Sequence, residues 1–188
     1  MANSINNKYL KIQKIESEDI VNNLPPNILN SLQRIKEQFS LMQYKSGLED
    51  IEEIVMNLSS NVEQDREEAL QKVKGLSWFK IWDLSDDCFI ENHSMNSWLK
   101  FIQKTIKEVE KYIKLKREIN ILYENLKNVV MDEDVLKEIK KNIFQLYNSN
   151  KQAKQNAHNK LSNISFSNDD YNIIYKQILN KSENILKY

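Results

Sequence analysis

Apolar residues recur at intervals of three and four along most of this chain, the spacing that places them on one face of an α-helix. The longest such stretch, residues 98–130, contains neither Gly nor Pro. Its face is formed first by Trp98, Ile102, Thr105, Val109 and Tyr112, and then, after a shift of one three-residue step, by Leu115, Ile119, Leu122, Leu126 and Val129. This shift turns the apolar face around the helix axis, so we expect the two parts of the helix to contact different neighbours.

The same spacing predicts two helices before the long one. Residues 24–27 (Leu-Pro-Pro-Asn) form a helix start, because Pro is tolerated in the first turn, and the apolar series continues over 28–42. The next helix is acidic and is predicted to run from Leu48 through Val73. Gly75 follows it as a left-handed C-cap.

Two further helices are predicted after the long one. Residues 132–134 supply an acidic cap for a helix whose apolar face extends over 135–164, with Asn150 within that face. Residues 165–170 form a connection rich in N-cap residue types, and 171–185 make the last amphipathic segment.

The domain organisation follows from these segments. Residues 1–23 are polar and are expected to be flexible or weakly helical. Residues 24–188 are expected to form a single elongated helical domain with a break near 76–96, where the helical pattern is lost. Asn96 or Ser97 is expected to cap the long helix.

Composition supports an all-α fold. The 188 residues include 2 Gly and 2 Pro, too few for the turns of a β-rich or α/β protein. The predicted fold is an elongated bundle of four to five long amphipathic helices. The net charge of zero does not point to nucleic acid or to a membrane surface, and no transmembrane segment is predicted. A single cysteine fits a reducing compartment, so a cytoplasmic location is expected.

Catalytic and metal-binding patterns are weak. One connection groups the ligand-type residues Asp86, Asp87, Cys88, Glu91 and His93. It lacks zinc-site spacing, and Cys88 with His93 would act as nucleophile and base only if the fold brought them together. His158 is expected to be exposed on a polar helix face. The sequence has only two glycines, at positions 47 and 75, so it cannot contain a Gly-rich phosphate-binding loop. We therefore predict no enzyme, no cofactor and no metal.

Two candidate partner-binding surfaces stand out. The first is a row of five lysines at helical spacing, here called the lysine face: Lys100, Lys104, Lys107, Lys111 and Lys114. It could contact phosphates or acidic groups. The alternative is a solvated face, compensated in part by Glu108 and Glu110 or by the acidic helix. Without interleaved aromatic residues it does not favour single-stranded nucleic acid, which is disfavoured as the primary ligand.

The second surface comprises the aromatic residues Trp78, Phe79 and Trp82. Exposed together, they would form an apolar patch on which a partner could dock. The alternative is that they fill the junction where long helices diverge.

A colinear series of segments resembles the early and middle part of the V domain of ALIX-type adaptor proteins, the Bro-domain family. The series comprises LPPNIL at 24–29, VEQDREEAL at 62–70, FKIW at 79–82, SWLKFI at 97–102, EINILYENL at 118–126, DEDVLKEIKKNIFQL at 132–146 and KLSNISFSNDDYNIIYKQIL at 160–179. The likeness covers residues 24–179 and rests on the order of the segments, since no single segment is diagnostic.

The resemblance implies an elongated, two-armed helical domain. In that family the domain holds short Tyr-Pro-x-Leu-type motifs, can bind ubiquitin and links cargo to the ESCRT machinery, which adds an endosome-associated location. The family's peptide pocket is formed largely by residues downstream of this chain's last segment, so no residue here is assigned to it. The Bro domain and the Pro-rich tail of the family do not appear, which suggests a fragment or a truncated relative.

Two functions follow as expectations. The first is a non-enzymatic adaptor or scaffold that binds short peptide motifs or partner proteins between helices. The alternative is a small helical subunit or inhibitor that docks on a larger protein or nucleoprotein complex through the lysine face. The protein is expected to be a monomer or, if its apolar faces do not close internally, a coiled-coil homodimer.

Overall fold

The structure, a computed structural model, describes residues 24–42, 47–78, 80–81 and 95–188. Over these residues it is all-helical and contains no strand, which confirms that the protein is all-α. The helices with defined bounds are α2 (Pro26–Leu41), α3 (Glu49–Leu58), α4 (Glu63–Gly75), α6 (Met95–Lys127), α7 (Glu133–Leu146), α8 (Lys151–Ser162) and α9 (Asp169–Ile185).

These helices divide into two compact units. The N-terminal unit is Pro26–Lys111 and contains α2, α3, α4 and the first part of α6. The C-terminal unit includes Tyr112–Tyr188, with the second part of α6 and α7, α8 and α9. The division falls where the apolar series of α6 shifts, and each part of this helix packs within its own unit.

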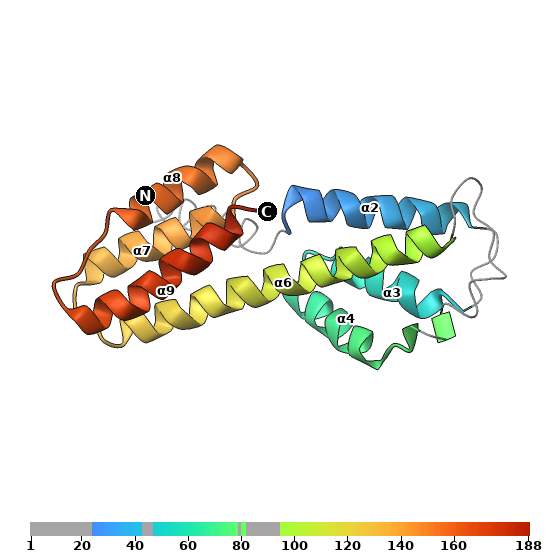
Figure 1. Cartoon of the computed structure of the whole chain (residues 1–188), viewed down its shortest axis with the longest axis horizontal. Coiled ribbons are helices and arrows are strands. Elements are labelled where there is room, and N and C mark those ends of the chain that lie inside the picture. The colour runs from blue at the N-terminus through green and yellow to red at the C-terminus, as the bar shows by residue number, and fades with distance from the viewer. Residues whose placement is uncertain (1–23, 43–46, 79, 82–94) are drawn as a thin grey trace, which may run out of the picture. The chain divides into compact units, whose positions relative to one another are not determined.

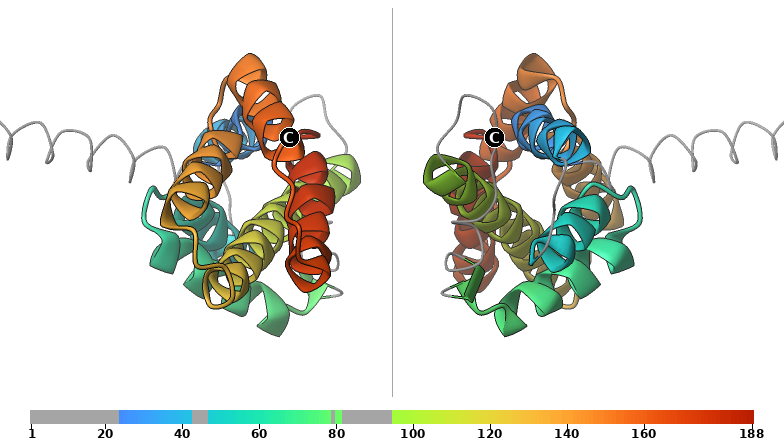
Figure 2. Two further views of the ribbon diagram at one scale, coloured as in Figure 1. Left: turned by 90° about the vertical axis from the view of Figure 1, so that its left-hand side faces the viewer. Right: turned by 90° about the vertical axis from the view of Figure 1, so that its right-hand side faces the viewer.

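The N-terminal unit is built on the apolar face of α2. Pro26 begins this helix, as the Pro-Pro pair predicts, and the residues that follow at four- and three-residue spacing are fully buried: Ile28, Leu32, Ile35 and Phe39. They pack with the buried residues of α3 and of the first part of α6, among them Ile51, Leu58, Leu99, Ile102 and Val109. Figures 1 and 2 show α2, α3 and the first part of α6 running side by side.

The acidic helix predicted from Leu48 to Val73 is two helices, α3 and α4, separated at residues 59–62. Ser60 Oγ accepts a hydrogen bond from the backbone N–H of Val62 at 3.0 Å and donates one to Asp65 Oδ2 at 2.6 Å. The buried Arg66 donates from Nη1 to the carbonyl oxygen of Ser60. Side chains that bond the local backbone compete with the helical ladder, and here they end it.

The two glycines differ in conformation, and one of them contradicts the prediction. Gly47, before α3, adopts the left-handed conformation with φ of 83°. Gly75 is instead the last helical residue of α4, and the next residue, Leu76, is extended with φ of −70° and ψ of 131°. The predicted left-handed C-cap at Gly75 is therefore wrong, because the chain leaves α4 by an extended residue.

In the C-terminal unit, α7 and α9 lie alongside the second part of α6, and α8 packs against α7 and α9 (Figure 2, left). Its core is formed by buried residues of all four segments, including Ile119, Leu126, Ile139, Ile143, Leu146, Leu161, Ile178 and Ile185. The face predicted for the second part of the long helix is only partly buried: Leu115 and Leu122 of α6 are half-buried, and Val129, just after the end of α6, is exposed. Ile113 and Tyr123 are buried in their place, so the contact face lies slightly to one side of the predicted one.

The helix predicted over 135–164 is also two helices, α7 and α8. Asn150, expected within an apolar face, is the N-cap of α8, and its side chain accepts from the backbone N–H groups of Gln152 and Ala153. Asp132 caps α7 as predicted, and Asn168, in the predicted connection, caps α9. The long helix α6 begins at Met95, so Asn96 and Ser97 lie inside its first turn and the predicted cap is wrong.

Candidate partner-binding site

The predicted aromatic patch is described at one of its three residues. Trp78 is half-buried. Phe79 and Trp82 lie outside the described residues, so the docking patch and the junction-filling alternative both stay predictions. The group Asp86, Asp87, Cys88, Glu91 and His93 lies outside them as well. Among the residues that are described, no three His, Cys, Asp or Glu side chains come together as a metal site.

The lysine face is exposed along its whole length. Lys100, Lys104, Lys107 and Lys111 belong to the N-terminal unit and Lys114 to the C-terminal unit. Within the described ranges none of the five forms an ion pair. Glu108, Glu110 and the acidic helix make no ion pair with these lysines among the described residues, and their weaker compensation of the charge, the alternative to partner binding, stays a prediction.

An ion pair within the acidic segment joins α3 to α4. Glu53 of α3 accepts from Lys72 Nζ of α4 at 2.5 Å, beside a depression lined by Asp50, Ile54, Gly75 and Leu76. The pKa of Lys72 is raised above its ordinary value. The largest cause is this hydrogen bond, and the charges of nearby carboxylates add a smaller contribution. The pair joins α3 to α4 and leaves the lysine face without a counter-charge from Glu53.

His158 is not the exposed residue that its polar surroundings predict. It is half-buried, and its Nδ1 lies 2.8 Å from Oγ of Ser182, which is fully buried on α9. The Ser182 hydroxyl donates to the carbonyl oxygen of Leu179 at 2.7 Å. With that proton in use, the serine oxygen accepts from His158 Nδ1–H, so this pair is a helix–helix contact between α8 and α9.

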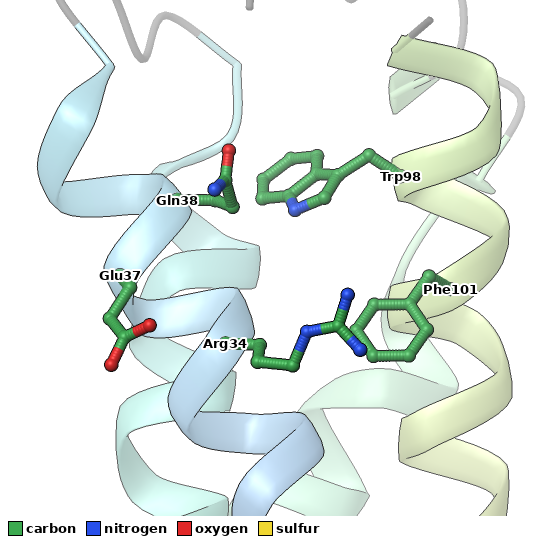
Figure 3. Close-up of a pocket in the computed structure, with 5 residues that line it drawn as sticks. All are labelled: Arg34, Glu37, Gln38, Trp98 and Phe101. Carbon is green, nitrogen blue, oxygen red and sulfur yellow. The ribbon is translucent and has the colours of Figure 1, made fainter. Parts of the chain in front are cut away.

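A pocket lies between α2 and the first part of α6, within the N-terminal unit (Figure 3). It has a volume of about 120 Å³ and is lined by Arg34, Glu37 and Gln38 of α2 and by Trp98 and Phe101 of α6. The helical spacing explains this lining: positions 34, 37 and 38 share one face of α2, and 98 and 101 are one turn apart on α6.

Each wall of this pocket is held by an aromatic contact. The indole of Trp98 packs edge-on against the buried ring of Phe39, with ring centroids 4.8 Å apart and planes at 69°. The guanidinium of Arg34 lies over the ring of Phe101, 5.3 Å from its centroid. Both contacts join α2 to α6, and they fix where the polar atoms at the pocket point.

The polar atoms of the pocket are only partly used. Trp98 is 6% exposed, and its Nε1–H is buried without a hydrogen-bond acceptor among the described residues. The sequence pattern identified Trp98 only as part of an apolar face and did not single out Arg34. A buried Trp ordinarily needs an acceptor for its N–H, so asking where that acceptor lies would have directed attention to this region.

Two further properties were compared with known patterns: the length and apolarity of the helices, and the similarity of the chain to other proteins. None of the helices there has the length and apolarity needed to cross a bilayer. Comparison with protein-family models, with curated proteins and with solved structures gave no match.

Proposed function

We propose that the protein is a non-enzymatic helical adaptor or scaffold that binds a partner protein or a short peptide. The α2–α6 pocket carries this proposal, because it presents an exposed cation, two aromatic side chains and an unused donor on a helix–helix surface. Polar groups elsewhere, such as those of His158 and Ser182, serve helix–helix contacts. Capture of a peptide between helices is a common binding mode for such surfaces.

The finer form of the proposal is the likeness to the V domain of ALIX-type adaptors. It includes a two-armed arrangement, recognition of Tyr-Pro-x-Leu-type motifs and a cytoplasmic, endosome-associated role. Small-angle scattering tests the arrangement: a compact chain of this length would have a radius of gyration of about 16 Å, and a monomer with separated arms a markedly larger one. A compact monomer would contradict the two-armed form.

Peptide binding tests the function directly. A library of displayed short peptides, with Tyr-Pro-x-Leu motifs included, is selected against the full chain and against the Arg34→Ala variant. Arg34 is exposed, so this change should leave the fold intact. We expect peptides that bind the wild type with micromolar affinity and the variant more weakly. If no selected peptide binds in calorimetry, the adaptor function is contradicted; if none contains Tyr-Pro-x-Leu, only the V-domain form is.

A second candidate function is docking on a larger protein or nucleoprotein complex through the lysine face. The observation that favours it is that these five lysines are exposed and form no ion pair with described residues. Binding of this kind should weaken steeply as salt is raised, and replacing Lys104 and Lys107 by Gln should reduce the salt dependence. Peptide capture at the pocket should depend on salt far less.

A further inference from the structure

The α2–α6 pocket contains two kinds of hydrogen-bond donor that the described residues do not use. Figure 3 shows the Trp98 indole with its nitrogen on the edge turned toward Arg34 and Phe101. Leaving a buried N–H without an acceptor has a free-energy cost, because the hydrogen bond that the group would make in water is lost. An acceptor supplied from outside the chain would remove that cost, so the geometry favours a ligand that brings an oxygen to this position.

Arg34 supplies the second kind of donor. Its guanidinium is held over the Phe101 ring and forms no ion pair with any residue in the described part of the chain. This contact uses the positive charge against the ring and does not use the guanidinium N–H groups as hydrogen-bond donors. The edge of a guanidinium matches the two oxygens of a carboxylate.

The size and charge of the pocket limit which chemical groups it can bind. About 120 Å³ equals the liquid volume of about four water molecules, enough for a carboxyl group on a short stem. Glu37 lies on the rim and accepts from Gln33 Nε2 at 3.0 Å, which leaves its negative charge in place. That charge disfavours a doubly charged phosphate more than a singly charged carboxylate. Gln38 can donate to or accept from the backbone of a peptide that carries the carboxylate.

We propose that this pocket binds the side-chain carboxylate of an acidic residue in a partner polypeptide, with Trp98 Nε1–H and the Arg34 guanidinium as donors. The proposal rests on the adaptor function and names the chemistry of its partner. The rings of Trp98 and Phe101 line the pocket and would contact the carboxyl stem.

The test is a titration of the full chain, labelled with ¹⁵N, followed through its indole N–H resonances. The chain has three tryptophans, and the Trp98→Phe variant assigns the Trp98 signal. If that variant fails to fold, triple-resonance spectra assign it instead. The probe is N-acetyl-glutamate α-amide, whose only charge is the side-chain carboxylate. Its matched control is N-acetyl-glutamine α-amide, and inorganic phosphate is the third probe.

We expect a saturable downfield shift of the Trp98 indole proton with the glutamate probe, at millimolar concentration, and none with the glutamine control. Arg34→Gln should weaken binding about tenfold, since it removes one charge-assisted contact. Glu37→Gln should strengthen it, because it removes a like charge. Lys74→Gln also removes one positive charge from the N-terminal unit, but Lys74 lies in the last turn of α4 and does not line the pocket, so it should leave binding unchanged.

An unshifted Trp98 resonance, an equal shift with the glutamine probe, or stronger binding of phosphate would each overturn the proposal. So would equal losses in Arg34→Gln and Lys74→Gln, which would indicate a general charge effect. The adaptor function fails separately. If selected peptides bind without moving the Trp98 resonance, the carboxylate site is overturned and the adaptor function stands.

Discussion

The two units of this chain treat their buried polar groups in different ways. In the C-terminal unit the hydroxyls of Tyr123, Tyr147 and Tyr175 each donate to a backbone carbonyl of a neighbouring helix, at 3.3, 3.4 and 2.7 Å. In the N-terminal unit the helices are joined by ring contacts, and the buried N–H of Trp98 has no acceptor among the described residues. The first arrangement satisfies these hydroxyls within the chain, whereas the second leaves a donor that the proposed ligand would satisfy.

The helix starts show the same difference. In the C-terminal unit the helices α7, α8 and α9 each have a side-chain N-cap, from Asp132, Asn150 and Asn168. In the N-terminal unit the N-caps of α3 and α4 are Leu48 and Val62, which offer no side-chain acceptor. The helix starts of the C-terminal unit are therefore stabilised by side-chain hydrogen bonds that α3 and α4 lack. The experiments below test this contrast.

The largest effect is expected at Tyr175. Its hydroxyl joins α9 to the end of α8, and its side chain is 2% exposed. Burial, and to a lesser extent the charge of Glu138, raises the pKa of Tyr175, so the hydroxyl stays protonated as a donor. Tyr175→Phe removes one buried hydrogen bond, but the Leu161 carbonyl keeps the N–H of Ile164. We expect urea unfolding to show a loss of about 1.5 kcal/mol.

The matched control for this change is Tyr171→Phe. Tyr171 lies on the same helix and is half-buried. Like the ring of Tyr175, its ring packs edge-on against Phe166, with centroids 6.0 Å apart. No hydrogen bond of its hydroxyl accompanies that contact in the described part of the chain, so we expect a change within about 0.5 kcal/mol. Equal losses at both positions would mean that ring packing, rather than the hydroxyl, stabilises this unit.

A smaller effect is expected from exchanging helix caps between the units. Asn168→Ala removes the acceptor for the N–H groups of Asp170 and Tyr171 and should cost about 1 kcal/mol. Val62→Ser should add a side-chain acceptor at the N-cap of α4 and so stabilise that helix. Val62 is exposed and already has the extended backbone of an N-cap, with φ of −87° and ψ of 122°. We expect a gain of about 0.5 kcal/mol in thermal or urea unfolding. A loss on Val62→Ser would show that Ser60 and Asp65 already satisfy this helix start.

The helices of both units could be predicted from the sequence to a large extent, because burial follows helical spacing. Ile28, Ile35 and Phe39 are buried where the pattern places them, and Asp132 caps its helix. The breaks at 59–62 and 147–150 were missed for a physical reason: apolar spacing continues across both. What ends the helices is local hydrogen bonding by Ser60 and Asn150, which competes with the backbone ladder.

The candidate site could not be predicted in the same way. Arg34 and Trp98 are far apart in the chain, and no periodicity indicates that α2 lies against the first part of α6. The exposed position of Arg34 looks like that of any other surface cation until Phe101 is placed beneath it. The same holds for His158, whose neighbours in sequence are polar but whose partner, Ser182, is contributed by another helix.

The smallest effect, and the one that compares the units most directly, concerns two ion pairs of equal length. Lys181 donates to Glu118 at 2.5 Å in the C-terminal unit, where both side chains are about one-third exposed. Lys72 donates to Glu53 at 2.5 Å in the N-terminal unit, where the side chains are 49% and 55% exposed. Solvent screens the second pair more, so a double-mutant cycle at each should give about 0.5 kcal/mol for Glu118–Lys181 and less for Glu53–Lys72.

The pH dependence of folding stability tests independently whether the Glu118–Lys181 pair is stabilising. The hydrogen bond from Lys181, opposed in part by burial, holds the pKa of Glu118 below its ordinary value of 4.5. A carboxyl group with a lowered folded-state pKa stabilises the fold above its unfolded-state pKa, and this contribution is lost as the pH falls through the folded-state value. The stability difference between wild type and Glu118→Gln should therefore be present at pH 7 and vanish in strong acid. A difference that persisted there would show that Glu118 acts by packing rather than by charge.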